Sequence, residues 1–247
     1  MQISSSSDIG KLRQTNQDFY NIEQLEDDLT WVAVCDGMGG ASGGNIASAS
    51  AVKVMSEFIL NSVHGALSDE EFKENLLKSI NYANEFIYSS SSNNPSLKGM
   101  GTTCVCAIIN KNKAYLANVG DSRAYFISND NIFQITKDHS IVQEMIDSGK
   151  ITKDEAVNHP RKNIITRAIG VAENIEVDCY EFDLNKDDII FICTDGFSNY
   201  ASNEQILKLA KESEFEDLAK NAIDFANDAG GHDNITVVAL RRDIPNG

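Results

Sequence analysis

Basic residues are scarce in this sequence, and it has no long hydrophobic run. Lysine and arginine number 21 against 37 aspartates and glutamates, which gives a formal net charge of −16. A chain this acidic does not bind nucleic acid or an anionic membrane through its overall charge. No run of the roughly 18 apolar residues that a membrane-spanning helix needs is present. Residues 1–8 have neither a basic start nor an apolar stretch, so we expect no signal peptide.

Cysteine is also scarce, with five residues in all. Most of them lie inside apolar runs, where a free thiol packs as a small hydrophobic side chain: Cys35, Cys104, Cys106 and Cys193. Cys104 and Cys106 would share one face of a strand, but no second Cys or His pair at zinc-binding spacing accompanies them. We therefore expect buried, reduced cysteines and a cytoplasmic protein.

Several common catalytic signatures are missing. There is no G-x-x-x-x-G-K-[ST] phosphate loop and no G-x-S-x-G nucleophile turn. Gly37-Met-Gly-Gly-Ala-Ser-Gly43 lies between a strand-like run and a helical pattern, but the G-x-G-x-x-G spacing is missing, and Asp36 would repel a pyrophosphate there. No cysteine has the spacing of an arginine-loop nucleophile, so covalent catalysis is not expected.

Hydrophobic periodicity predicts strands and helices that occur in blocks. Strand-like runs cover residues 30–35, 102–109, 114–119, 122–127, 132–136, 175–182, 188–193 and 235–240. Helical spacing covers residues 43–60, 69–88, 140–148, 204–211 and 215–226. Short connections between consecutive strands favour antiparallel sheets, and helices that do not follow every strand argue against a doubly wound parallel fold.

Cap and break signals divide these elements. Ser68 precedes the second helical run, with Glu71 three residues later, which is typical of a capping box. Residues 89–95 form a polar break after that helix, and residues 151–163 are irregular and charged, as in a surface excursion. With no internal repeat and no linker, we expect a single domain over residues 1–247.

Four apolar, strand-like runs lie next to an aspartate: Asp36, Asp121, Asp195 and Asp233. The end of a strand is rigid and can hold a carboxylate in place, and Mg²⁺ and Mn²⁺ prefer carboxylate and carbonyl oxygens. The glycine after Asp36 and after Asp195 would leave room for a carbonyl or water at an ion. A single Asp-Gly or Asp-Asn pair is more often a turn. If all four carboxylates meet, however, bound cations would relieve their repulsion, so we hypothesise a divalent-metal site.

A set of short segments follows in order along the chain: Arg13…Asn16-Gln-Asp18, Asp36-Gly-Met-Gly-Gly40, Gly101-Thr-Thr103, Val119-Gly-Asp-Ser-Arg123, Asp138-His-Ser140, His159-Pro160…Asn163-Ile-Ile-Thr-Arg-Ala-Ile-Gly170, Thr194-Asp-Gly196 and Gly231-His-Asp-Asn234. Together they resemble the metal-dependent type-2C (PPM) serine/threonine protein phosphatases in their compact bacterial form. An ordered set that spans nearly the whole chain is far more specific than any one segment. The resemblance implies an α+β fold, a four-layer α-β-β-α sandwich with two central antiparallel β-sheets flanked by helices.

The resemblance also implies an enzyme. Such a phosphatase hydrolyses phosphoserine and phosphothreonine with a metal-activated water and forms no phosphoenzyme. It uses Mn²⁺ or Mg²⁺, with two core ions and a third, weaker one in bacterial members. Its partners are phosphoproteins, including a serine/threonine kinase that it opposes and the targets of that kinase. We expect a monomer that binds neither nucleic acid nor a membrane.

Most of the metal ligands follow from the same resemblance. Asp36 matches the carboxylate that bridges two metals, and Gly37 offers its carbonyl to one of them. Asp195 and Asp233 match ligands of the first metal. Asp18 matches a ligand of the second metal, bound directly or through water.

The remaining site residues are also implied by the resemblance. Arg13 matches the arginine that grips the substrate phosphate, and a guanidinium can hold two phosphate oxygens at once. By position alone, a surface arginine in a very acidic protein is the better interpretation of Arg13. Asp121, together with Asp195, matches the third metal site, and Asn234 supports the ligands from behind. Residues 151–163 match a mobile flap that helps to choose substrates.

One departure concerns the general acid. Many eukaryotic members carry a histidine after the Asp-Gly pair that is proposed to protonate the leaving oxygen. Met38 occupies that position here and cannot donate a proton. A metal-bound water is one candidate for this role, and His139 and His159 are candidates by residue type. His139 fits a structural role better, and His159 lies on the flap.

Two other functions stay open at this point. The first is a non-enzymatic module, either a pseudophosphatase that binds phosphoproteins or a cation-stabilised scaffold. The presence of every predicted ligand argues against it. The second is a phosphatase of small metabolites, which sequence alone does not separate from a protein phosphatase.

Overall fold

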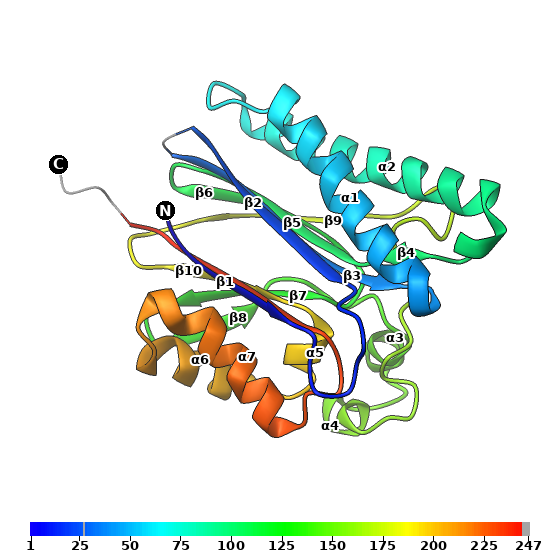
Figure 1. Cartoon of the computed structure of the whole chain (residues 1–247). Helices are drawn as coiled ribbons and strands as arrows, with labels where there is room; N and C mark the ends of the chain where they lie inside the picture. Colours follow the sequence, from blue (N-terminus) through cyan, green and yellow to red (C-terminus); the bar gives the residue numbers. More distant parts are fainter. Residues whose placement is uncertain (27, 244–247) are drawn as a thin grey trace.

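The computed structural model describes residues 1–26 and 28–243, with residues 40–42 described by their backbone only. Two antiparallel β-sheets stack face to face, and helices cover the outer side of each sheet (Figure 1). The four-layer α-β-β-α sandwich predicted from the sequence is confirmed. Helices therefore flank the sheets and do not alternate with their strands.

The first sheet joins both ends of the chain. Its strand order is β1 (Gln2–Asp8), β11 (Ile235–Arg241), β10 (Ile189–Cys193), β7 (Arg123–Ser128) and β8 (Asn131–Gln134). β1 pairs with β11 along its whole length, from Gln2 opposite Arg241 to Asp8 opposite Ile235. Strand β1 is therefore held in the sheet only when β11 is also in place.

The second sheet contains the long central strands. Its order is β2 (Asp18–Glu26), β3 (Leu29–Met38), β5 (Cys104–Asn110), β6 (Lys113–Val119) and β9 (Asp178–Asp183). The short strand β4 (Gly101–Thr102) pairs with the end of β3. The strand predicted to stop before Asp36 thus continues to Met38, because β4 supplies partners beyond the end of β5.

Two helical layers enclose the sheets (Figure 1). The second sheet is covered by α1 (Gly40–Ser62) and α2 (Asp69–Asn93). The first sheet is covered by α5 (Asp195–Ser198), α6 (Asn203–Glu212) and α7 (Leu218–Ala229). Shorter elements lie in the connections: α3 (Ile141–Asp147), α4 (Lys153–Val157), and the 3₁₀ turns η1 (Pro95–Leu97) and η2 (Phe215–Asp217).

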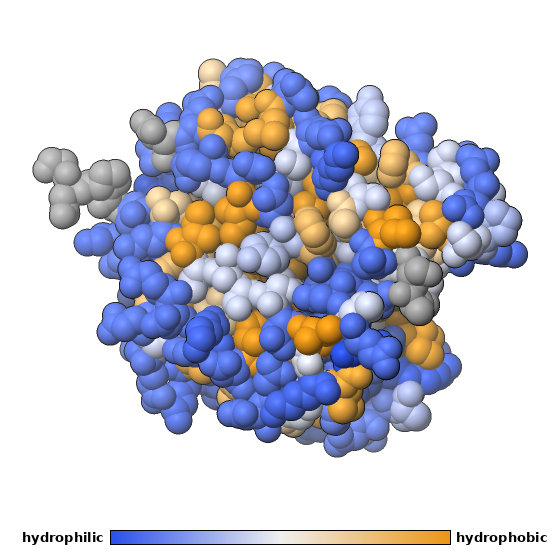
Figure 2. Space-filling model, in the orientation of Figure 1, coloured by the Kyte–Doolittle hydropathy of each residue, from blue (hydrophilic) through white to orange (hydrophobic). Residues whose placement is uncertain are grey.

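Strand β3 explains why the central strands are apolar without alternation. Trp31, Ala33 and Cys35 pack against the helices of the second sheet. Val32 and Val34 point the other way, into the layer between the two sheets. Successive side chains of a strand face opposite sides, so a strand that is buried on both sides must be apolar throughout. The surface is left largely hydrophilic, as the face in Figure 2 shows.

The cysteines behave as predicted. Cys35, Cys104, Cys106 and Cys193 are buried and unpaired, and Cys179 is exposed. Burial raises the pKa of the Cys193 thiol above its usual range, so this thiol is unreactive in the fold. None of the helices in the described part of the chain combines the length and hydropathy of a membrane-spanning segment.

The predicted polar break at residues 89–95 is wrong in its extent. Helix α2 continues to Asn93, and the hydroxyl of Ser90 donates to the carbonyl of Phe86 one turn earlier. Ser90 therefore satisfies its hydroxyl within the helix instead of breaking it. The helix ends where Asn94 precedes Pro95, because proline disfavours helical geometry in the residue before it.

Strand β1 and a short helix, α4, were not predicted from the sequence pattern. Strand β1 reads Gln-Ile-Ser-Ser-Ser-Ser-Asp, and its polar residues form a strand because β11 supplies a partner for the whole length. Residues 151–163 contain a helix, α4, where an irregular segment was expected. Thr152 and Glu155 form a capping box at its start, so the T-x-x-E pattern was a usable signal.

Helix α2 offers a test of the local sequence signals. Ser68 Oγ accepts from the Glu71 N–H at 3.3 Å, and the Glu71 carboxylate accepts from the Ser68 N–H at 2.8 Å. Ser68→Ala should lower the free energy of unfolding by about 1 kcal/mol, since the Glu71 N–H loses its side-chain acceptor. Urea denaturation measures this change. Ser89→Ala, near the exposed end of the same helix, should stay within about 0.5 kcal/mol of wild type; equal losses would contradict the prediction.

Candidate metal centre

Strand direction brings the predicted aspartates to one edge of the sandwich. β3 and β6 both run antiparallel to β5 between them, so their C-terminal ends lie at the same edge. Asp36 lies near the end of β3, and Asp121 follows β6. In the other sheet the end of β10 meets the start of β11, which places Asp195 beside Asp233.

A cleft of about 650 Å³ opens at this edge. All but one of the site residues predicted from the sequence line it: Arg13, Asp36, Gly37, Asp121, Asp195, Asp233 and Asn234. Met38 lines it too. Residues from both sheets and from the loop after β1 therefore converge, as the metal-site hypothesis requires.

Asp18 is the exception and lies behind the cleft. It is only 6% exposed and stands directly opposite Asp36 in the pairing of β2 with β3. Its Oδ2 accepts hydrogen bonds from the hydroxyls of Thr194 and Thr236, both at 2.8 Å. Opposed aspartates on neighbouring strands repel each other, so this pair needs compensation from donors or cations.

Burial and repulsion between the aspartates strongly raise the pKa values of several carboxyl groups at this edge. Burial raises the pKa of Asp18 to about 7 and of Asp121 to about 8, and nearby aspartates add to both rises. Burial raises the pKa of Asp36 well above its ordinary value, followed by repulsion from Asp18 and Asp195. Burial, followed by repulsion from Asp233, also raises the pKa of Asp195 to about 6. The carboxyl groups thus meet and disfavour one another's charge.

The donor set fits a hard divalent cation. Oδ1 of Asp18 and Oδ1 of Asp195 are buried, and neither has a hydrogen-bond partner among the described residues. A buried carboxylate oxygen without a donor is costly unless a cation or water satisfies it. Carboxylate oxygens are the ligands that Mn²⁺ and Mg²⁺ take.

The carboxylates also turn toward protein donors. Arg13 Nη2 contacts Asp233 Oδ2 at 2.8 Å, and Asn199 donates to Asp195 Oδ2 at 3.1 Å. Over residues 1–26 and 28–243, no three acidic, His or Cys side chains form a group that could already hold a metal ion. Arg13 and Asp233, predicted to bind phosphate and metal separately, therefore form an ion pair with each other.

Asn234 organises the loop that carries Arg13. Its Oδ1 accepts from the Gln17 N–H at 2.8 Å, and its Nδ2 donates to the carbonyls of Ile9 at 2.9 Å and Thr15 at 3.0 Å. These bonds clamp both ends of the loop between β1 and β2. The predicted supporting position of Asn234 has a physical basis in these contacts.

Glycine follows Asp36 and Asp195 for a different structural reason from the one expected. A Cβ on Gly37 would lie 2.0 Å from the carbonyl oxygen of Gly44, and a Cβ on Gly196 would lie 1.9 Å from that of Asn234. Glycine is required because another backbone segment packs against the strand end. A side chain at either position would clash with this backbone segment and would not fill the space for a ligand.

Two threonines near Asp36 were missed as functional residues. Thr103 Oγ1 accepts from the Asp36 N–H at 3.0 Å, and Thr102 Oγ1 donates to the Asp36 carbonyl at 2.8 Å. Ser122 Oγ lies 2.7 Å from Thr103 Oγ1. The segment Gly101-Thr-Thr103 was a signal for the family, but its contact with Asp36 depends on the pairing of β3 with β4.

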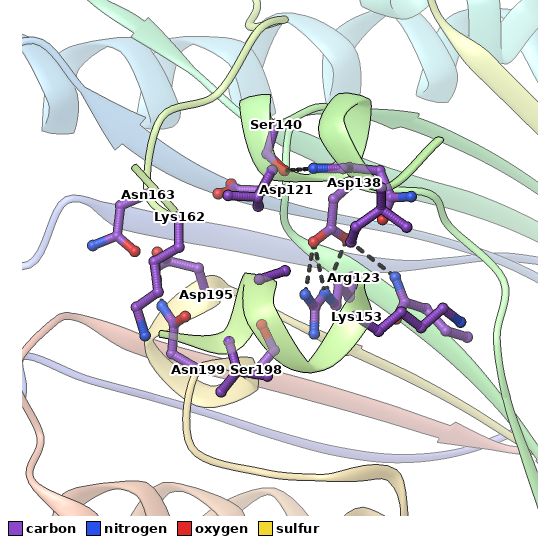
Figure 3. Close-up of a pocket in the computed structure, with 16 residues that line it drawn as sticks. Asp121, Arg123, Asp138, Ser140, Lys153, Lys162, Asn163, Asp195, Ser198 and Asn199 are labelled. Carbon is purple, nitrogen blue, oxygen red and sulfur yellow. Dashed lines mark hydrogen bonds and ion pairs between the residues drawn. The ribbon is translucent and has the colours of Figure 1, made fainter. Parts of the chain in front are cut away.

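A second cavity, of about 270 Å³, lies beside the cleft (Figure 3). Asp121 and Asp195 line both cavities. Arg123 contacts both oxygens of Asp138 at 2.7 to 3.1 Å, so a neutralised pair stands next to Asp121. The predicted flap, residues 151–163, contributes lining residues from α4 and from the loop that follows.

Comparison with known proteins decides the family. The model of protein phosphatase 2C matches residues 11–236. The chain belongs to the protein phosphatase 2C family. The serine/threonine phosphatase Stp of Listeria monocytogenes serotype 4b is 37% identical over 245 residues, which cover 99% of this chain and 97% of that protein. The protein phosphatase PhpP of Streptococcus pneumoniae serotype 2 is 34% identical over 241 residues, 97% of each protein.

Solved structures agree with this membership. A serine/threonine phosphatase of S. agalactiae superposes with a TM-score of 0.92 at 34% identity, covering 98% of this chain and 99% of that one. The catalytic domain of the serine/threonine protein phosphatase PstP, solved with two manganese ions, has a TM-score of 0.84 at 30% identity and 98% coverage of each chain. The predicted family, the fold class and the main function, an enzyme that is a protein serine/threonine phosphatase, are confirmed.

The two histidines that were candidates for the general acid of this phosphatase, His139 and His159, do not line the cleft. His139 is buried, accepts from the Gly120 N–H at 3.0 Å, and has Asp178 3.2 Å from its other ring nitrogen. Burial lowers the pKa of His139, so it is neutral and holds the turn before Asp121. His159 accepts from the Arg161 N–H at 3.2 Å within the flap. Neither histidine is among the residues that line the cleft.

The raised pKa values predict a pH dependence of stability in the metal-free protein. From the ordinary aspartate value of 3.8 up to about 8, the folded state holds more protons than the unfolded state. Its free energy of unfolding therefore falls as pH rises through this window. We expect the Tm of chelator-treated protein to be lower at about pH 8 than at about pH 5.5.

Asp36→Asn should reduce this fall in Tm, because one charge leaves the cluster. Each kcal/mol recovered corresponds to about 2–4 °C for a chain of this size. Asp187→Asn, in an exposed turn, is the matched control and should behave like wild type. Calorimetry across the pH range makes the measurement. An unchanged slope in Asp36→Asn would show that the cluster does not set the pH dependence.

Proposed function

We propose that this phosphatase dephosphorylates phosphoserine and phosphothreonine in proteins at the cleft, with two core Mn²⁺ or Mg²⁺ ions. The single observation that carries the proposal is the convergence of Asp36, Asp121, Asp195 and Asp233 on one cleft with Arg13 at its side. The buried Oδ1 of Asp195 without a donor, and the pKa of Asp36 raised by burial and then by neighbouring aspartates, give the site a reason to bind cations. The PstP structure with two manganese ions supports the number and type of ions.

The proposed roles follow the chemistry of each group. Asp36 would bridge the two ions, with the Gly37 carbonyl as a further ligand of one. Asp195 and Asp233 would hold the first ion, and Asp18 would act on the second from behind the cleft. Bound divalent cations would supply Lewis-acid chemistry that activates water for attack at phosphorus. Separate carboxylates, rather than one chelating loop, would then fix the ions to both sheets.

Arg13 would change partner during the reaction. In the protein without ligands it neutralises Asp233 at 2.8 Å. Once Asp233 is committed to a cation, the guanidinium would be released to bind two phosphoryl oxygens of the substrate. It would stabilise the charge that develops on those oxygens during transfer.

We also propose several finer properties of the enzyme. Asp121 and Asp195 line both cavities, which supports a third ion between them. Residues 1–247 would act as one monomeric phosphatase domain whose flap, residues 151–163, selects phosphoproteins. Its partners would include a serine/threonine kinase and the targets of that kinase. The buried, unpaired cysteines support a cytoplasmic location.

Asp36→Asn tests the centre directly. Turnover of a phosphothreonine peptide with Mn²⁺ should fall by more than about 100-fold, since even the residues behind metal ligands are worth about 10- to 100-fold. A chelator should abolish wild-type turnover, and Asp187→Asn should retain it. Wild-type turnover by Asp36→Asn would refute the proposal. Faster hydrolysis of sugar phosphates or nucleotides than of phosphopeptides would indicate a metabolite phosphatase, and peptide binding without turnover a pseudophosphatase.

Arg13→Ala tests phosphate binding. Hydrogen bonds to charged groups contribute about 1.5–3 kcal/mol, so kcat/KM for the peptide should fall about 10- to 100-fold. The affinity for Mn²⁺ should not fall, because the substitution removes only a group that competes with the ion for the Asp233 carboxylate. Lys11→Ala removes a neighbouring charge that does not line the cleft and should leave the kinetics unchanged. A loss confined to metal affinity would contradict this role.

A further inference from the structure

A closed ring of hydrogen bonds lies behind the cleft and includes Asp18. The Asp18 N–H donates to Oδ1 of Asn16 at 3.1 Å, and Nδ2 of Asn16 donates to Oγ of Ser7 at 2.9 Å. The hydroxyls of Ser7 and Thr236 are 2.8 Å apart, and Thr236 donates to Oδ2 of Asp18 at 2.8 Å. Thr194 donates to the same oxygen at 2.8 Å.

The neighbours of each hydroxyl fix the direction of its hydrogen bond. Ser7 accepts from Asn16, so its own proton goes to Thr236. Thr236 accepts from Ser7 and donates to Asp18. Thr194 Oγ1 accepts the N–H of Thr236 at 3.0 Å and also donates to Asp18. A hydroxyl has only one proton, so every chain of donation ends at Oδ2 of Asp18.

The ring also joins the two sheets. Asp18 begins β2 in the second sheet, whereas Ser7 and Thr236 lie opposite each other on β1 and β11 in the first. Thr194 and Thr236 are fully buried, at 0% exposure. A valine has the shape of threonine and would fill either position without a buried hydroxyl to satisfy. The hydroxyls therefore serve the carboxylate rather than the packing.

The two threonines decide which oxygen of Asp18 remains available. With Oδ2 held by two donors, the carboxylate cannot rotate without breaking both bonds. Oδ1 is buried and has no partner among the described residues. Without the hydroxyls, repulsion from Asp36 on the neighbouring strand would turn the carboxylate away.

We propose that Thr194 and Thr236 are positioning residues of the metal centre, which hold Oδ2 of Asp18 so that Oδ1 is presented to a divalent cation or to water bound to it. Partners behind metal ligands orient them and tune their affinity in this way. The inference rests on the proposed function, because it requires that the aspartates of the cleft bind cations.

Thr236→Val removes the hydroxyl and keeps the shape of the side chain. Calorimetric titration with Mn²⁺ in the absence of substrate should show affinity about 10- to 100-fold weaker at the site that Asp18 serves. Thr236→Ser should restore it. Thr30→Val removes a buried hydroxyl that bonds Gln24, outside the ring, and should bind Mn²⁺ like wild type.

A double-mutant cycle shows whether the effect passes through Asp18. On the Asp18→Asn background, Thr236→Val should cause no further loss of Mn²⁺ affinity. A full additional loss would overturn the inference, as would wild-type affinity in Thr236→Val. If Thr236→Val does not fold by its metal-free Tm, Thr194→Val carries the same expectation.

The outcomes also distinguish a failure of this inference from a failure of the proposed function on which it rests. A wild-type protein that binds no Mn²⁺ would refute the proposed metal-dependent function. A wild-type protein that binds Mn²⁺, beside a Thr236→Val variant that binds it equally well, would refute only the positioning role. The conservative serine variant distinguishes the lost hydroxyl from a general loss of packing.

Discussion

Mutual repulsion among buried carboxylates is the constraint on which this structure depends. Asp18 and Asp36 face each other across paired strands, and Asp195 stands close enough to raise the pKa values of Asp36 and Asp121. Such a cluster lowers the stability of the fold, and the apolar layers on both sides of each sheet must outweigh it. In the proposed function, this local loss of stability is what gives the site its affinity for cations.

The sandwich makes this arrangement possible because each sheet contributes part of the centre. Asp18 and Asp36 lie on strands of the second sheet, Asp121 follows strand β6 of that sheet, and Asp195 and Asp233 lie beside strands β10 and β11 of the first sheet. The packing layer between the sheets therefore sets the separation of the two groups. Substitutions in that layer, far from any ligand, would change the geometry of the centre as well as its stability.

Much of the centre could be predicted from sequence, but its contacts could not. An apolar run followed by aspartate is a local signal, and it correctly placed Asp121 and Asp195 just after a strand, whereas Asp36 lies within β3, two residues before its end. The opposition of Asp18 and Asp36 depends on strand register, which no local pattern encodes. In the sequence, Thr236 looks like an ordinary strand residue and the residues of β1 look like a polar tail. Their partners lie more than 200 residues away, so no local pattern shows them.

The pairing of β1 with β11 has a consequence for the synthesis of this enzyme. Asp18 and Thr236, which touch in the finished protein, are 218 positions apart, and β11 is the last strand of the described chain. A nascent chain on the ribosome lacks Asp233, and lacks the Thr236 hydroxyl of the ring around Asp18, until residues 233–236 have been translated. Fragments that stop before this point would therefore lack part of the proposed centre.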